Sequence, residues 1–541
     1  MSAVISVAGR GFVKSMQEDV NPLPNQKERI VNDWKFTPKL YPHFDHMIYN
    51  KQEAFALVQS PAIVAQHTFY PFLEYKVAHR KLTKSIQKHE AAIREQDTSG
   101  IIVRKARPIK YACHKDAIVY SYYRHMLAQL YEKRLQELNI SQNVIAYRKI
   151  PIADQSDAGK CNIHFAKEAF DEIIARGTCI AITLDIKGFF ESLNHDFLHQ
   201  KWCELLNLEC LPKDHEHIFK NITQYSYVDL DQCYESLGFI DIKNRKRTYK
   251  ICPYKLAEQK KKLCSNNEYR ERIVKLVQKN NYQQKTIPQG IPQGSPISDI
   301  LANLYMIDFD VKMQELACHY NGYYRRYSDD ILWICSPENA KIIEDTTKEV
   351  MLQQGQSTLK IHDDKTTHTR FTRQTDGQLH YENISEDETK TQKMFSYLGF
   401  SFNGQKAFFR ESTLSRYKRD VTFSVRSFVK RAADAAEKNG GKLLNNLNVS
   451  MIYHKNSYLN KEYIEDQREE NLANGAQWKR TEGNFRTYEI RAKKVFNCAG
   501  SLYPLSDSQL KKHKKFVTET IIQEARKFEP TFSLKAQHPN T

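Results

Sequence analysis

Three aspartates lie where strand-like segments of the sequence end. Asp185 is close to the end of the apolar, β-branched run CIAITLDI, and Asp329 and Asp330 stand together in the polar turn of segment 322–335. If the two segments are neighbours in one sheet, their acidic ends converge. Adjacent carboxylates raise each other's pKa unless a cation lies between them. Aspartate is also common in ordinary turns, so the pattern alone leaves both interpretations open.

Carboxylates gathered in this way are typical ligands of divalent cations. Mg²⁺ prefers a few carboxylates together with water and phosphate oxygens in an octahedral shell. Two such ions ~3.5–4 Å apart neutralise the charge that develops on the oxygens during phosphoryl transfer. If the three aspartates converge, they would form a site for two Mg²⁺ ions, for which Mn²⁺ can substitute.

The segments around the aspartates predict the elements that must position them. Residues 179–186 are typical of a buried strand because they are apolar and β-branched. Segment 322–335, GYYRRYSDDILWIC, predicts two strands around a tight turn. Segment 392–410 predicts another hairpin, with Asn403 and Gly404 at its turn.

The region that precedes the first of these strands is of mixed character. Ser60-Pro61 is typical of a helix start, and apolar residues follow at mixed helical spacing over 62–82. Residues 101–165 contain two β-like runs, IIVRKARPIKYA and NVIAYRKI. A helix is expected between them, at about 117–138.

Charge and cysteine content limit the class of protein. The 541 residues carry a net charge of +17, and residues 411–541 hold 24 Lys and Arg against 15 Asp and Glu. Such an excess attracts phosphate backbones, although a basic surface also occurs in proteins that bind no nucleic acid. Eleven cysteines without a C-x-x-C pair indicate reduced thiols and a cytoplasmic location. We expect neither a membrane span nor a secretory signal.

Five motifs follow one another in order between residues 100 and 410. They are TLDIKGFFESL (183–193), GIPQGSPISDILANLYM (290–306), RRYSDDILWI (325–334), LKIHDDKT (359–366) and YLGFSF (397–402). Together they resemble the reverse transcriptases, specifically those of bacteria. The resemblance implies an α+β fold, a right-hand polymerase with fingers, a ferredoxin-like palm and a helical thumb, with helical N- and C-terminal regions.

The resemblance also implies a division of the chain. Residues 1–100 are then a helical N-terminal region, and residues 101–180 are the fingers. Residues 181–410 are the palm, with an insertion at about 196–285. Residues 411–541 are the thumb and a basic helical C-terminal region.

The catalytic roles come from the same resemblance. It implies that Asp185 and Asp329 ligate both metal ions, that the Ile186 backbone carbonyl adds an oxygen, and that Asp330 is the neighbouring carboxylate. Lys365 is then the general acid for the departing pyrophosphate. Its alternative is an ordinary solvated lysine.

Two aromatic residues follow the first aspartate. By resemblance, Phe190 is the steric gate that excludes a 2′-hydroxyl and so selects deoxynucleotides. Phe189 is assigned to the nucleotide site with it. The alternative is that one of the two is simply a core residue.

The Pro-Gln-Gly loop is present twice, as the tandem IPQGIPQG at 287–294. We take the second copy as the working one, because Ser295-Pro296 and a helix follow it directly. Gln293 and Gly294 are then expected at the nucleotide, where glycine permits close backbone approach.

The remaining contacts are assigned by resemblance. Arg148 and Lys149 are expected at the triphosphate, with a surface strand charge as the alternative. The expected primer and template contacts are Tyr327, Ser328, Ser295 and Gly399. Ser328 is a departure, because many members of the family carry Ala or Met there.

The predicted function is an RNA-directed DNA polymerase with an RNA template, dNTPs and a DNA product. Three features are most similar to the defence-associated or abortive-infection group, which implies a dedicated non-coding RNA template. They are the stretch YLGFSFNGQKAFFRESTLSRYKRD (397–420), the long segment 196–285 and the basic helical C-terminal region. A retron- or intron-type reverse transcriptase, an RNA-synthesising polymerase and a catalytically silent RNA-binding scaffold stay as alternatives. A homo-oligomer and a partner protein are both left open.

Overall fold

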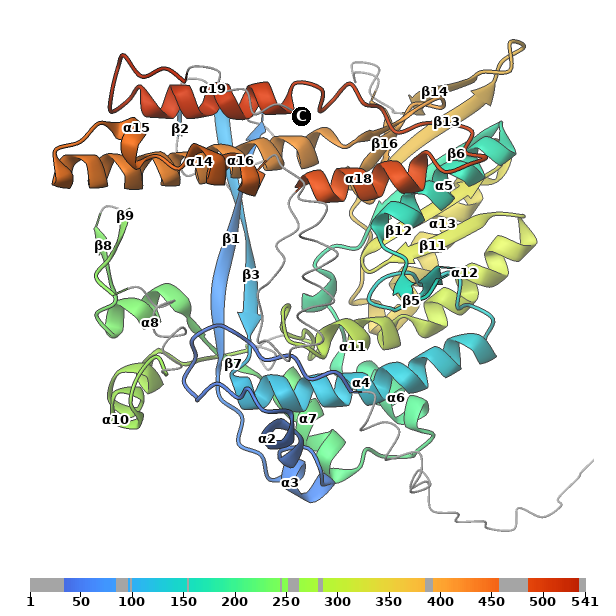
Figure 1. The fold of residues 1–541 in the computed structure, drawn as a ribbon. Helices are drawn as coiled ribbons and strands as arrows, with labels where there is room; N and C mark the ends of the chain where they lie inside the picture. The colour runs from blue at the N-terminus through green and yellow to red at the C-terminus, as the bar shows by residue number, and fades with distance from the viewer. Residues whose placement is uncertain are drawn as a thin grey trace, which may run out of the picture. The chain divides into compact units, whose positions relative to one another are not determined.

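The computed structural model describes residues 34–83, 96–97, 100–152, 155–243, 246–251, 262–280, 286–384, 393–456 and 485–534 (Figure 1). The N-terminal segment MSAVISVAGRGFVKS lies outside the described residues. The chain divides into two compact units. The first unit comprises Met1–Arg134 and His195–Leu304, and the second comprises Leu135–Asn194 and Tyr305–Thr541.

A five-stranded sheet organises the second unit, with the strand order β11-β12-β6-β13-β14. All neighbouring strands in it are antiparallel. Its members are β6 (Cys179–Asp185), β11 (Tyr323–Tyr327), β12 (Asp330–Cys335), β13 (Thr367–Arg373) and β14 (Leu379–Ile384). The strands predicted at 179–186 and 322–335 are therefore confirmed.

The connections of this sheet define its topology. Within the second unit the chain runs β6, α12 (Ile307–His319), β11, β12, α13 (Ala340–Gln353) and β13. This βαββαβ order, with β6 and β12 in the middle of the sheet, is the ferredoxin-like arrangement. β14 extends one edge. The predicted ferredoxin-like palm is confirmed.

Both faces of the sheet are covered, which explains why β6 is apolar along its length. Side chains alternate between the faces of a strand. Cys179 shares one core with α5 (Asn162–Arg176). Ile182 points to the opposite face, where its register partner His368 bonds to Glu344 of α13.

A small sheet follows the palm strands. It consists of β15 (Phe395–Tyr397), β16 (Phe400–Phe402) and β17 (Ala407–Phe409), all antiparallel. The predicted turn at Asn403 and Gly404 joins β16 to β17 and is confirmed.

The C-terminal part of the second unit is helical over its described residues. Buried residues recur every fourth position along α14, at Tyr417, Val421, Val425 and Val429, and form one apolar stripe. α14 lies beside α19 in Figure 1. The helices are α14 (Glu411–Asn439), α15 (Leu443–Asn446), α16 (Val449–Asn456), α18 (Phe485–Phe496) and α19 (His513–Ala525).

The first unit is built around a second sheet, with the order β10-β7-β1-β3-β2. Its two long strands, β1 and β3, run side by side as an antiparallel pair (Figure 1). The strands are β1 (Phe72–Thr83), β2 (Gln96–Asp97), β3 (Gly100–Tyr111), β7 (Ser226–Asp229) and β10 (Gln278–Lys279). A separate hairpin joins β8 (Ile240–Lys243) and β9 (Lys246–Tyr249).

Helices accompany this sheet. They are α2 (Lys51–Ala56), α3 (Pro61–Ala65), α4 (His114–Glu137), α6 (His195–Leu206), α7 (Lys213–Thr223), α8 (Leu230–Ser236), α10 (Asn266–Glu268) and α11 (Ser298–Tyr305). α4 agrees with the helix expected at about 117–138. Ser60 caps α3 and Pro61 is its first residue, as predicted.

Two local predictions are wrong. The helical interpretation of 62–82 fails after Ala65, because Phe72–Thr83 is a strand. Its stability comes from pairing with β3, a contact distant in sequence that outweighs mixed helical spacing. NVIAYRKI is no strand either: only Val144 makes an isolated bridge there, to Arg326.

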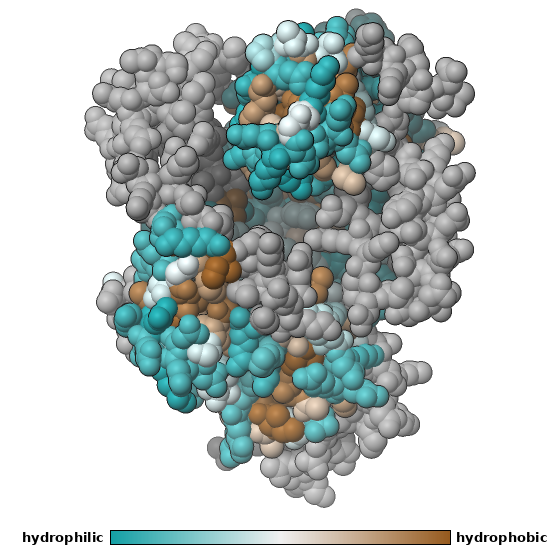
Figure 2. Space-filling view, turned by 60° about the vertical axis from the view of Figure 1, so that its left-hand side comes forward, coloured by the Kyte–Doolittle hydropathy of each residue, from teal (hydrophilic) through white to brown (hydrophobic). Residues whose placement is uncertain are grey.

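Hydrophilic residues cover most of the described surface on the face in Figure 2, and hydrophobic residues form small separate patches. Scattered exposed apolar residues of this kind are ordinary for a folded protein. Among the described residues, no helix has the length and apolar character that crossing a membrane requires.

Candidate active site

The acidic turn lies at one end of two central strands of the second unit. Tyr327 pairs with Asp330 and closes a two-residue turn of Ser328 and Asp329. β12 pairs with β6 so that Asp330 lies directly opposite Asp185. The structure thus brings together the three aspartates singled out from the sequence.

Backbone hydrogen bonds fix the ends of these strands. The Ile186 amide donates to the Asp329 carbonyl at 3.0 Å. The His362 amide donates to the Asp185 carbonyl at 2.8 Å, and Lys187 donates to Lys360 at 2.8 Å. Asp185 is therefore held between two neighbouring segments, which restricts where its carboxylate can lie.

The three carboxylates influence one another's charge. Desolvation by the surrounding protein, and then the negative charges of Asp329 and Asp185, raise the pKa of Asp330 to about 7. The Asp330 residue is nevertheless exposed at the surface. We therefore give the negative charges of Asp329 and Asp185 more weight than desolvation as the cause of the raised pKa. A bound cation would neutralise these charges.

A cation from the chain itself neutralises part of this charge. The Lys365 ammonium forms an ion pair with Oδ1 of Asp185. Lys365 lies on a short 3₁₀ turn, Asp363–Lys365, that directly precedes β13. Lys365 is therefore next to the acidic turn, as a general acid requires, but bonded to a carboxylate.

The acidic residues are suited to metal binding by their chemistry. The three aspartates lie at the same end of β6 and β12, and a positive group already balances one of them. In the described part of the chain, no three His, Cys, Asp or Glu side chains are grouped so that they could hold a metal ion in their present positions. The carboxylate donors fit hard divalent cations, which take oxygen ligands.

The two phenylalanines after Asp185 differ in exposure. Phe189 is 3% exposed and belongs to the core, whereas Phe190 is only partly buried. Their ring centroids are 5.5 Å apart. Of the two, Phe190 is thus the one whose ring remains accessible to a ligand.

Arg148 and Lys149 lie in the loop that follows α4. The Arg148 guanidinium donates to the carbonyls of Ser141 and Val144, both at 2.5 Å. Lys149 is exposed. Arg148 therefore stabilises its own loop, and its contact with a triphosphate stays a prediction.

Gly399 occupies a second tight turn of the second unit. Leu398 and Gly399 join β15 to β16, with φ values of 45° and 92°. The Leu398 carbonyl accepts from Asn162 Nδ2 at 3.1 Å, and the Gly399 carbonyl accepts from Arg410 at 3.0 Å. The turn is thus tied to α5 and to the start of α14.

The Pro-Gln-Gly loop belongs to the first unit. The Lys110 amide of β3 donates to the Gln293 carbonyl at 2.8 Å. A Cβ on Gly294 would lie 2.7 Å from the Lys110 carbonyl oxygen, so the loop and the strand touch backbone to backbone. Only glycine permits this approach. Ser295 is buried, and its hydroxyl is without a hydrogen-bond partner.

The two copies of the loop differ in exposure. Gly290 of the first copy is buried, and its carbonyl lies 2.9 Å from Nε2 of His195. Gly294 of the second copy is exposed. Both have a positive φ, 102° and 110°. The second copy is thus the one accessible to a ligand.

Sequence reasoning missed two buried ion pairs next to these turns. Arg326 and Asp310 of the second unit are both 0% exposed. In the first unit, Lys110 Nζ lies 2.7 Å from Glu74 Oε2, and its side chain is 9% exposed. The sequence signal that could have found them is a charged residue at an inward position of a strand. In YYRRY, the buried residues Tyr324 and Arg326 alternate with half-buried neighbours.

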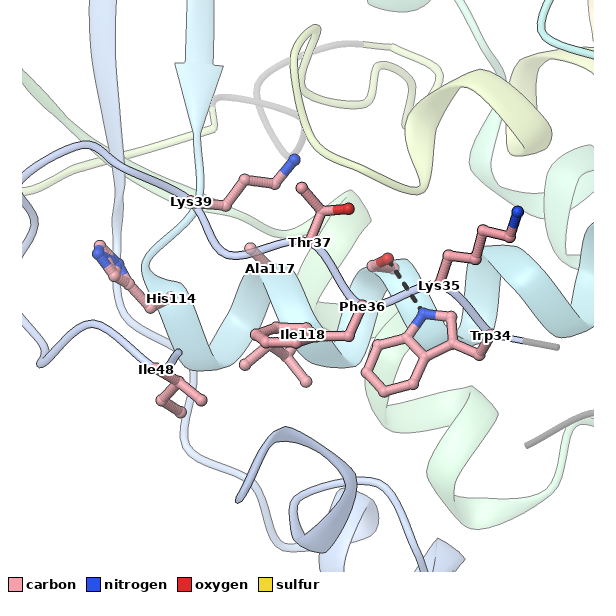
Figure 3. A pocket seen from close by; sticks show the side chains of 10 residues that line it. Trp34, Lys35, Phe36, Thr37, Lys39, Ile48, His114, Ala117 and Ile118 are labelled. Carbon is pink, nitrogen blue, oxygen red and sulfur yellow. Dashed lines mark hydrogen bonds between the residues drawn. The ribbon is translucent and has the colours of Figure 1, made fainter. Parts of the chain in front are cut away.

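The first unit has a cavity of about 150 Å³ beside α4 (Figure 3). Trp34, Phe36 and Ile118 form its apolar wall, and Lys35 and Lys39 lie at its edge. None of the residues singled out from the sequence lines it. It therefore adds no residue to the candidate site.

Residues 207–402 match the family model described as reverse transcriptase (RNA-dependent DNA polymerase). The match includes Asp329 and Asp330 and begins after Asp185. No curated protein matches the chain.

Among solved structures, the chain is similar to two yeast telomerases. Telomerase from Candida albicans, in complex with a TWJ fragment of telomeric RNA, is 11% identical, with a TM-score of 0.33 and coverage of 87% of this chain and 64% of that chain. Apo telomerase from Candida tropicalis is 11% identical, with a TM-score of 0.33 and coverage of 79% and 61%. The chain thus spans less than two thirds of the length of these telomerases. Residues 207–402 are thus similar to a reverse transcriptase (RNA-dependent DNA polymerase) domain.

Proposed function

We propose that the chain copies RNA into DNA with two divalent cations, Mg²⁺ in the cell, held at the acidic turn. Asp185 and Asp329 are the expected shared ligands, with the Ile186 carbonyl as a further oxygen and Asp330 as the neighbouring carboxylate. One observation supports this most: Asp330 lies opposite Asp185 in the register of β12 and β6. The cations, when bound, supply positive charge to the transferring phosphoryl group.

The chain's own residues perform the other steps. Lys365 is paired with Asp185 here. Asp185 would hold a divalent cation, and the ammonium of Lys365 beside it would donate a proton to the departing pyrophosphate. Lys365 is thus proposed as the general acid.

Sugar and base selection are assigned to two groups of residues. Phe190, accessible while Phe189 is buried, is proposed to stand beneath the sugar and to exclude a 2′-hydroxyl. Gln293, which is half-buried, and Gly294, which is exposed, are proposed to contact the incoming nucleotide. Lys149 and Arg148 are proposed at its triphosphate.

The primer and template are proposed to contact the turns and the basic helix. The turn residues are Tyr327, Ser328, Ser295 and Gly399. Exposed basic residues of α14 are suited to phosphate contacts along the duplex, which position a nucleic acid without reading its sequence. They are Arg416, Lys418, Arg419, Lys430 and Arg431.

Primer extension tests the proposal. The purified chain receives an RNA template, an annealed DNA primer, Mg²⁺ and dNTPs. We expect extension, and loss of about 10³-fold or more in Asp329→Asn, since each bound cation contributes several kcal/mol of charge stabilisation. Asp345→Asn, which changes an exposed aspartate of α13, is the matched control. Full activity of Asp329→Asn would contradict the proposal.

Nucleotide choice separates DNA synthesis from RNA synthesis. We expect the wild type to prefer dNTPs over NTPs, and Phe190→Ala to reduce that preference. A wild-type enzyme that prefers NTPs would favour the RNA-synthesising alternative.

We also propose a biological setting, a bacterial defence system with a dedicated non-coding RNA as template and a cytoplasmic location. Its support is the resemblance to that group of residues 397–420, of the long segment 196–285 and of the basic C-terminal region. Sequencing of the RNA and DNA that co-purify with the chain identifies the template, and a retron- or intron-type RNA would replace this setting. Phage plating with Asp329→Asn distinguishes a defence enzyme, which loses protection, from a silent scaffold, which keeps it.

A further inference from the structure

Two strained residues of the second unit lie in contact at the acidic turn. Ser328 has a φ of 60° and Tyr147 has a φ of 63°. A non-glycine residue adopts this region rarely, and a bulky one persists there only when the surrounding structure holds it. The Tyr147 hydroxyl donates to Ser328 Oγ at 3.1 Å. Backbone strain is therefore concentrated in two residues joined by one hydrogen bond, and one of them, Ser328, directly precedes Asp329.

A buried ion pair holds the same turn from inside. Arg326 binds Asp310 through two parallel bonds, Nε to Oδ1 at 2.8 Å and Nη2 to Oδ2 at 2.6 Å. The Tyr324 hydroxyl donates to the same carboxylate at 2.6 Å. The remaining nitrogen, Nη1 of Arg326, donates to the Ser328 carbonyl at 3.1 Å. The guanidinium thus fixes the carbonyl of the strained residue.

The backbone of Arg326 holds the segment that carries Tyr147. Its amide donates to the Asn143 carbonyl at 2.8 Å, and its carbonyl accepts from the Ile145 amide at 3.0 Å. Arg326 therefore holds both sides of this hydrogen bond. Its side chain binds Ser328, and its main chain binds the segment that leads to Tyr147.

We propose that Tyr147 is a positioning residue for the reaction: with Arg326, it holds Ser328 in its left-handed conformation and so sets where Asp329 and Asp330 present their carboxylates. The inference rests on the proposed metal-binding role of those aspartates. Tyr147 is 42% exposed, so its side chain is not part of the packed core. An alanine at position 328 would leave Tyr147 without this acceptor.

A double-mutant cycle tests the inference. Tyr147→Phe and Ser328→Ala remove the same hydrogen bond from opposite ends, and the double variant removes it once. Mn²⁺ affinity is measured by electron paramagnetic resonance, and kcat and KM for dNTP by primer extension. We expect each single variant to weaken Mn²⁺ binding and to lower kcat about fivefold, the effect of one hydrogen bond. The double variant should have the same Mn²⁺ affinity and kcat as each single variant, and KM for dNTP should change little in all three.

Controls separate positioning from folding. The metal-free melting temperature should stay near that of the wild type in all three variants. Tyr453→Phe removes a tyrosine–threonine hydroxyl bond, to Thr518, in the C-terminal helices, and should leave Mn²⁺ affinity unchanged.

Two results would overturn the inference alone: an active wild type whose Mn²⁺ affinity is unaffected by Tyr147→Phe, or two single effects that simply multiply in the double variant. A folded wild type that neither binds Mn²⁺ nor extends a primer would overturn the proposed function as well. A Tyr147→Phe protein that melts well below the wild type would show a structural role in place of a positioning one.

Discussion

The acidic turn of the second unit and the Pro-Gln-Gly loop of the first unit stabilise similar backbones with different residues. Each contains a positive φ, 60° at Ser328 and 110° at Gly294. Each is hydrogen-bonded to a strand residue that belongs to a buried ion pair, Arg326 in one case and Lys110 in the other. Only the loop uses glycine, although glycine would fit both backbones.

The difference follows from what each position touches. At Gly294, a Cβ would lie 2.7 Å from a backbone oxygen, so no side chain fits. At Ser328, the side chain is itself bonded, to Tyr147. Glycine therefore stands where backbone meets backbone, and serine stands where a side-chain bond offsets part of the conformational strain.

Breaking the ion pair behind the acidic turn should have the largest effect on stability. Asp310→Asn leaves Arg326 buried without a counter-charge, and we expect a loss of about 3–5 kcal/mol in the free energy of unfolding. Denaturant titration measures it. Glu382→Gln, which breaks the exposed Arg370–Glu382 pair of the same unit, should cost less than about 1 kcal/mol. Equal losses of unfolding free energy in the two variants would show that burial does not determine how much an ion pair contributes.

Adding one methyl group to the loop should have the next largest effect. Gly294→Ala forces a clash with the strand and a strained φ, and we expect a loss of about 2–3 kcal/mol, together with weaker nucleotide binding. Gly238→Ala is the matched control, because Gly238 has a φ of 75° with nothing within 4 Å of the added Cβ. It should lose only about 1–2 kcal/mol. If both variants lose the same amount, contact with Lys110 is unimportant.

A third ion pair, between His368 and Glu344, is more exposed than the two buried pairs, so its contribution to stability can be compared with theirs. Hydrogen bonds from His368 lower the pKa of Glu344 from 4.5 to about 2, with Lys348 contributing further. Because the folded-state pKa is lowered, its stabilisation is complete above about pH 4.5 and is lost as the pH falls toward 2. We expect about 1.5–3 kcal/mol. Unfolding titrations at pH 6 and pH 3 should show this loss in the wild type and a smaller one in Glu344→Gln.

Replacing the strained serine with glycine should have the smallest effect on stability. Ser328→Gly removes the strain of the left-handed conformation, about 1–2 kcal/mol, but gives up the bond to Tyr147 and increases the entropy of the unfolded chain. The net change in unfolding free energy should stay within about 1 kcal/mol. In this background Tyr147→Phe should no longer alter Mn²⁺ affinity. A loss above about 3 kcal/mol would show that the serine side chain does more than bind Tyr147.

The sequence predicts the centre of the second unit well, because its signals are local. The β-branched run before Asp185 and the paired strands around Asp329 need only their own residues to be recognised. Where stability comes from distant partners, prediction fails. β1 is a strand because β3 pairs with it, and residues 143–150 are a loop because Arg148 and Arg326 bind their backbone.

The anchors of the site are equally hidden from local patterns. Asp310 is sixteen positions from Arg326 and lies on a different element. Glu74 and Lys110 meet only through the pairing of β1 with β3. In contrast to these anchors, Phe190 is named from the sequence by resemblance, and the structure adds that its ring is accessible while Phe189 is buried.

The most direct test of the central claim is anomalous diffraction from crystals of the chain soaked with Mn²⁺ and a non-hydrolysable dNTP. We predict two Mn²⁺ peaks at the end of β6 and β12, with oxygens of Asp185 and Asp329 as shared ligands and Lys365 no longer paired with Asp185. Peaks at another place in the molecule, or an intact Lys365–Asp185 pair with no Mn²⁺ beside it, would contradict the account.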